Sequence, residues 1–68
     1  MTEEEHLEWA KERAFMYLDE GDINQAKSSF TSDISKHEAL KESISSFLLM
    51  MLMTKDSVNE TRKFIEGF

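Results

Sequence analysis

Residues 44–53 constrain this chain more than any other stretch of its sequence. Placed on a helix, they carry apolar side chains on every side: Phe47, Leu48, Met51 and Leu52 on one, Leu49, Met50 and Met53 on the other. A helix that is apolar on every face has to be buried on every face, within its own domain or against another chain. A chain of 68 residues can hardly surround it alone. We therefore expect part of this helix to contact a second chain.

The length of the chain points in the same direction. Residues 1–68 make one helical domain, and a domain of this size buries only about 60% of the surface that it exposes when unfolded. There is no cysteine, so disulfides and thiolate metal sites are excluded, and two isolated histidines, His6 and His37, do not make a zinc site. We expect no metal and no cofactor. Self-association is the remaining way to add stability.

The pattern of apolar residues predicts an all-α fold, because no stretch alternates with period two over the length of a strand. We expect a small bundle of four helices, over about residues 3–20, 23–36, 39–53 and 57–66. Thr2 and Glu5 form a capping box at the first helix. Gly21 ends that helix, Asp22 caps the second, and Asp56 or Ser57 caps the fourth. The boundary near residues 36–38 has no glycine and is the least defined.

The third expected helix supplies a wide core face and three residues that lie off it. The core face comprises Ala39, Leu40, Ile44, Phe47, Leu48, Met51 and Leu52. Leu49, Met50 and Met53 fall outside this face, and we expect them to form an oligomer interface, most simply a two-fold dimer. Clustered methionines suit such an adaptable surface. The alternative is ordinary core filling.

A second candidate surface lies on the first helix, opposite its core stripe. It comprises His6, Trp9, Arg13, Met16 and Glu20. Exposed Trp and Arg are typical of interaction hot spots, so this face is a candidate contact for a protein partner. Two alternatives stay open: self-association through this face, and burial of Trp9 within the same chain.

The first two helices resemble a tetratricopeptide-repeat hairpin. Ala14, Tyr17, Gly21, Ala26 and Phe30 stand at the spacings of 3, 4, 5 and 4 that this repeat uses for its small, aromatic and turn positions. Trp9 lies one residue before the expected first aromatic, Asp33 replaces an alanine, and Glu38 replaces the closing proline. The resemblance implies a repeat-like hairpin, not a peptide-binding array.

Residues 7–22, 32–37 and 62–68 resemble small all-helical proteins encoded by bacteriophages and prophages. The resemblance covers about half of the chain. It implies an accessory role inside a host cell, but it identifies no functional residue and no chemical activity.

Several function classes are not expected. Ser32, Asp33 and His37 share successive turns of one helix and cannot surround one substrate atom, so we expect no enzyme. A net charge of −6 disfavours binding to nucleic acid, because an acidic surface repels the phosphate backbone. The apolar run is far shorter than the roughly 20 residues of a membrane span, and an acidic N-terminus does not resemble a secretion signal. We expect a cytoplasmic protein that does not associate with membranes.

The expected function is therefore that of a non-enzymatic protein-binding module. Its concrete version is a phage accessory protein that inhibits or redirects a host protein by surface contact, in defence evasion or host takeover. One alternative is an oligomer that sequesters a small molecule or nucleotide between subunits. Another is a structural or assembly factor of the virion.

Overall fold

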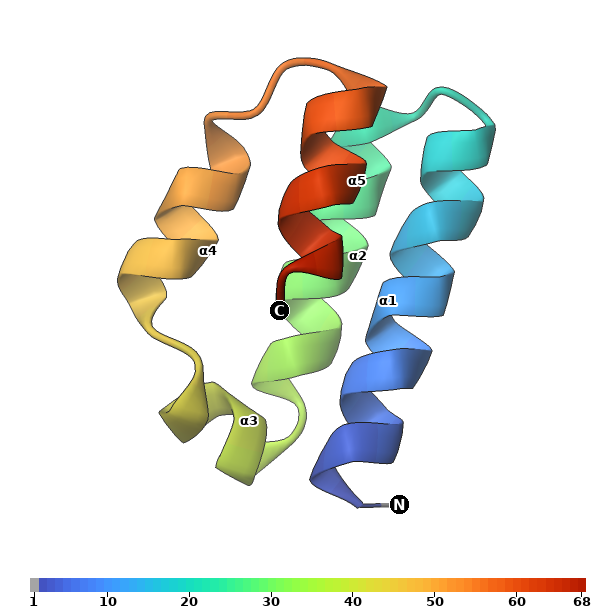
Figure 1. Ribbon diagram of the computed structural model, residues 1–68. Coiled ribbons are helices and arrows are strands. Elements are labelled where there is room, and N and C mark those ends of the chain that lie inside the picture. The colour runs from blue at the N-terminus through green and yellow to red at the C-terminus, as the bar shows by residue number, and fades with distance from the viewer. Residues whose placement is uncertain (1) are drawn as a thin grey trace.

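The computed structural model describes residues 2–68, and these residues form helices and no strand (Figure 1). The all-α prediction is confirmed. The five helices are α1 (Glu3–Asp19), α2 (Ile23–Ser35), α3 (Glu38–Ser43), α4 (Ser46–Met53) and α5 (Val58–Glu66).

The ends of α1 and α2 follow from local hydrogen bonds. The backbone N–H of Glu5 donates to the Thr2 hydroxyl at 3.2 Å, and the Thr2 N–H donates to the Glu5 carboxylate at 2.9 Å, so the capping box is confirmed. The Thr2 backbone and side-chain hydrogen bonds to this carboxylate lower the pKa of Glu5. Gly21 turns the chain with a φ of 78°, and Asp22 caps α2 by accepting from the Gln25 N–H at 3.1 Å. Short-range chemistry thus defines the hairpin.

The single helix expected over residues 39–53 is two helices. Ile44 and Ser45 are extended, with ψ angles of 119° and 137°, and they separate α3 from α4. The Ser45 hydroxyl accepts from the Phe47 N–H at 3.1 Å and so caps a new helix. Serines at 43, 45 and 46 favour this outcome, because their hydroxyls compete for backbone hydrogen bonds within a helix. The break allows α4 to take a direction of its own.

The helices pack around the α1–α2 hairpin. In Figure 1, α1 and α2 lie side by side and antiparallel, α5 lies in front of α2 and runs alongside it, and α4 stands at the outer edge, on the side away from α1. The short helix α3 connects the far end of α2 to α4. One long side of α4 is therefore turned away from the other helices.

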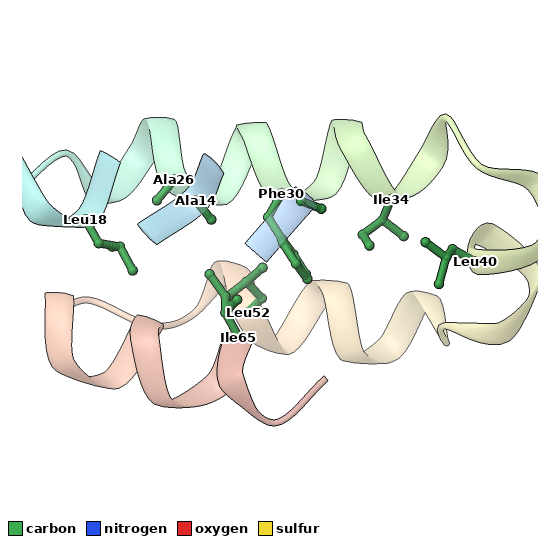
Figure 2. Close-up of a cluster of buried hydrophobic side chains, with 9 residues drawn as sticks. Ala14, Leu18, Ala26, Phe30, Ile34, Leu40, Leu52 and Ile65 are labelled. Atoms are coloured by element: carbon green, nitrogen blue, oxygen red, sulfur yellow. The ribbon is translucent and has the colours of Figure 1, made fainter. Parts of the chain in front are cut away.

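All five helices contribute to one hydrophobic core. Its buried residues are Ala10, Ala14 and Leu18 of α1, Ala26, Phe30 and Ile34 of α2, Leu40, Leu52 and Ile65. Figure 2 shows Phe30 between α2 and the pair formed by Leu52 and Ile65. The ring of Phe68 packs edge-on against Phe30 at 5.0 Å between centroids, so the residues after α5 fold back onto the core.

Candidate functional site

The outer face of α4 is apolar and exposed. Phe47, Met50 and Met53 are 64%, 68% and 53% exposed, although seven of the eight residues of this helix are apolar. Leu52 alone is fully buried, because only one side of α4 meets α2 and α5. The surface formed by Phe47, Leu48, Met50 and Met53 is called the α4 surface below. It is the largest group of exposed apolar side chains on one element of residues 2–68.

The α4 surface differs in part from the expected one. Met50 and Met53 are exposed as expected for an interface, whereas Leu49 is half-buried and packs against the core. Phe47 and Leu48 were expected in the core face, and this expectation is wrong, since they are 64% and 41% exposed. The break at Ile44–Ser45 is the cause, because it rotates and redirects α4 relative to the expected continuous helix. Ala39, on α3, was also expected in the core face, and it is exposed.

A groove runs between α4 and α5 next to the α4 surface. Leu48 lines it from α4, and Lys63, Phe64, Gly67 and Phe68 line it from the other side. Its volume is about 200 Å³. The rings of Phe64 and Phe68 meet edge-on, with centroids 5.5 Å apart. The groove is therefore an open hollow with aromatic walls.

Charge is absent from α4. The chain has 14 acidic residues, but none lies between Glu42 and Asp56. Cations do lie near it: the Lys27 Nζ donates to the Met53 carbonyl at 3.2 Å, and the Lys55 Nζ lies 5.1 Å from the centroid of the Phe64 ring. In a chain with net charge −6, α4 itself thus carries no carboxylate.

The candidate face on α1 is built around a buried carboxylate of α2. Asp33 is 1% exposed, and its Oδ2 lies 3.4 Å from the Arg13 Nε. Lys36 Nζ lies 3.6 Å from the Asp33 Oδ1, and the Ser29 hydroxyl donates to Oδ2 at 3.4 Å. A buried carboxylate requires such partners, because an unpaired charge away from water is costly. Asp33 therefore fixes the position of Arg13.

His6 contacts the same part of α2, and Trp9 packs against His6. The His6 Nε2–H donates to the Asp33 carbonyl at 2.6 Å, and the His6 ring packs on Trp9 and His37 with centroids 5.1 and 5.0 Å apart. The Arg13 guanidinium lies over the Trp9 ring at 5.0 Å. Thus His6, Trp9 and Arg13 are partly buried within the chain.

The remaining two residues of that face lie further along α1. Met16 is 67% exposed, and Glu20 is also exposed. With Arg13 and Tyr17 they line an open hollow of about 260 Å³. The face predicted on α1 is thus divided: its N-terminal half contacts α2, and its C-terminal half is open.

Residues outside the predicted sets carry much of both surfaces. The sequence pattern places Phe47 and Leu48 in the core face. It marks Asp33 only as a departure from the alanine of the repeat pattern and as a residue without a catalytic role. The serines at 43, 45 and 46 are the sequence signal that marks the helix break and hence the exposure of Phe47. No comparable signal marks the burial of Asp33, because it lies outside the core stripe of Ala26, Phe30 and Ile34 and aspartate is usually exposed.

Removal of the Asp33 carboxylate tests its role. We expect Asp33→Ala to lower the free energy of unfolding by about 1–2 kcal/mol. Ser29 and Arg13 lose their acceptor, but the loss is limited because the two cations, Arg13 and Lys36, stay partly in water. Chemical denaturation measures this loss, and Trp9 fluorescence should change in the folded state as Arg13 is released. The control is Ser32→Ala at the exposed neighbouring position, with an expected change within about 0.5 kcal/mol. Equal stabilities for the two variants would contradict the assignment.

The described residues offer few features for other chemistry. Within residues 2–68, no group of three or more His, Cys, Asp or Glu side chains could hold a metal ion. No helix in this range is both long and apolar enough to cross a membrane.

The chain was compared with models of protein families, with curated proteins and with solved structures, and none of these comparisons finds a match.

Proposed function

We propose that this chain is a non-enzymatic protein-binding module that acts through the α4 surface. The observation that carries the proposal is the exposure of Phe47, Met50 and Met53 together on one uncharged helix. Large apolar patches on a small protein mark interaction sites, and Phe and Met are enriched where two proteins meet. Methionine also adapts to partners of different shape.

The fold serves this role as a rigid support. We read α1 and α2 as a repeat-like hairpin, a reading supported by the complete burial of Ala14 and Ala26 and by the positive φ of Gly21. The four longer helices form the bundle in this reading, and α3 is a connection. The bundle holds α4 by Leu52 and by the Lys27 Nζ, which donates to the Met53 carbonyl at 3.2 Å. The outer face of α4 stays free for a partner.

The biological setting that we propose is an accessory protein of a bacteriophage or prophage, which inhibits or redirects a protein in the host cytoplasm. The resemblance of residues 7–22 and 62–68 to small phage-encoded proteins supports this setting.

Affinity capture with a double variant tests the proposal. We expect Met50→Ser with Met53→Ser to lower capture of host proteins at least about tenfold, because two apolar contacts are lost from the centre of the surface. Quantitative mass spectrometry of the captured proteins measures this change. Both residues are exposed, so the circular dichroism spectrum should not change.

The matched control is Met16→Ser, which removes an equally exposed methionine from α1. We expect it to retain capture. If the double variant and the wild type capture the same proteins in the same amounts, the α4 surface is not the binding site and the proposal is wrong.

A further inference from the structure

An exposed aromatic ring and an aromatic groove stand side by side on this molecule. Phe47 is 64% exposed, and the next residue, Leu48, lines the groove between α4 and α5. We propose that the occupant of the α4 surface is a second copy of this chain, with Phe47 of each copy seated in the α4–α5 groove of the other. This inference rests on the proposed function, because it names a partner for the same surface.

The groove has the size and walls that a phenyl ring requires. Its volume is about 200 Å³, and an apolar cavity of roughly 150 Å³ in a protein can hold benzene. Phe64 and Phe68 already pack edge-on at 5.5 Å, and a third ring can join them with the same geometry. A phenylalanine side chain from outside therefore fits this hollow.

The positions of Phe47 and Leu48 suit a two-fold dimer. In such a dimer, each contact between one residue and another is repeated in the opposite sense. Phe47 and the groove residue Leu48 are consecutive, so a two-fold axis passing near them places each ring opposite the groove of the other copy. Both grooves are then filled in a single arrangement.

Charge favours a second copy at this face rather than elsewhere. Two chains of net charge −6 repel one another, and most of their surfaces would bring carboxylates together. The stretch from Ser43 to Lys55 contains no acidic residue. The second copy offers the same apolar helix without carboxylates, so contact between the two α4 surfaces brings no acidic residues of this stretch together.

The dimer is expected to be reversible. The contact surface is centred on one helix of eight residues, which is small compared with the interfaces of permanent dimers. A reversible dimer can release the α4 surface to another protein, so self-association and the proposed function are compatible.

Two substitutions test the contact from its two sides. Phe47→Ser removes the ring, and Gly67→Leu fills the groove. Gly67 has an ordinary φ of −75°, and an added Cβ would meet only two backbone carbonyl oxygens, at 3.4 and 3.7 Å, so the fold accommodates a side chain there. We expect each variant to raise the dimer dissociation constant about 100-fold, because every dimer loses two contacts. Sedimentation velocity and light scattering over a range of concentrations measure it, with Met16→Ser as the unaffected control.

Cross-linking tests the identity of the two contacting segments. The chain has no cysteine, so single-cysteine variants give unambiguous disulfides. An oxidised mixture of Phe47→Cys and Gly67→Cys should yield a mixed disulfide dimer. A mixture of Met16→Cys and Gly67→Cys should yield only the background level.

The outcomes separate this inference from the proposed function. A wild-type chain that stays monomeric at all concentrations, or a mixed disulfide no more abundant than the background, overturns the second-copy proposal even if host proteins are captured through α4. Conversely, a dimer that forms as described, with capture unaffected by Met50→Ser and Met53→Ser, supports the second copy and counts against the proposed binding of a host protein.

Discussion

Phe30→Ala is expected to lower the free energy of unfolding by about 3–5 kcal/mol, because it empties the centre of the core. The Phe30 side chain is completely buried, and its ring packs edge-on against Phe68. A chain of 68 residues has a total stability of only about 3–10 kcal/mol. The variant should therefore be largely unfolded at physiological temperature. Circular dichroism during thermal and urea denaturation measures the loss.

The matched control makes the same chemical change at an exposed position. Phe47→Ala should alter the stability by no more than about 0.5 kcal/mol when the protein is dilute enough to be monomeric. A similar loss in the two variants would mean that Phe30 is not the central core residue.

Leu52→Ala is expected to cost about 2–5 kcal/mol and to release α4 before the rest of the molecule. Leu52 is the only fully buried residue of α4, so this helix has one principal anchor. The α1–α2 hairpin does not depend on Leu52 for its own contact. Regions with few buried contacts open locally at lower free energy than the core does.

Hydrogen exchange distinguishes local release from general unfolding. In Leu52→Ala, the amides of α4 should exchange much faster, while those of α1 and α2 should stay more protected. Leu48→Ala makes the same change one turn away at a side chain that is 41% exposed, and it should have a smaller effect. An equal loss of protection in all helices would contradict the single-anchor interpretation.

Features that depend on near neighbours in the chain could be predicted from the sequence. The capping box of Thr2 and Glu5, the turn at Gly21 and the caps at Asp22 and Ser57 are all present. Each needs only residues within one turn of helix, whose positions are known as soon as the helix is assumed. The extents of α1, α2 and α5 consequently agree with expectation within about one residue.

The break at Ser45 was not predicted, although its chemistry is local. A serine inside a helical pattern can either point to solvent or cap a new helix, and both are common. The choice depends on whether Leu40 and Leu52 can reach the same core, and both are buried on opposite sides of the break. That condition involves α2 and α5 as well as the serine.

The arrangement of the face on α1 depended on Asp33, which is 27 positions from His6 and 20 positions from Arg13. Trp9 could belong to an interaction surface or be buried within its own chain, and the sequence carried no signal to choose between these two possibilities. The observed contacts of Arg13 and His6 with Asp33 hold this region against α2. Such pairs form only once the crossing of α1 and α2 is set by packing.

The sequence by itself determined that the chain is helical, where most helices begin, and that residues 44–53 hold more apolar surface than one small domain can cover. The tertiary structure alone decided which part of that surface is left exposed. A helix that is apolar all round has no periodicity to mark its inner face, so the contacts of α4 with α2 and α5 select it. They bury Leu52 and leave Phe47, Met50 and Met53 exposed.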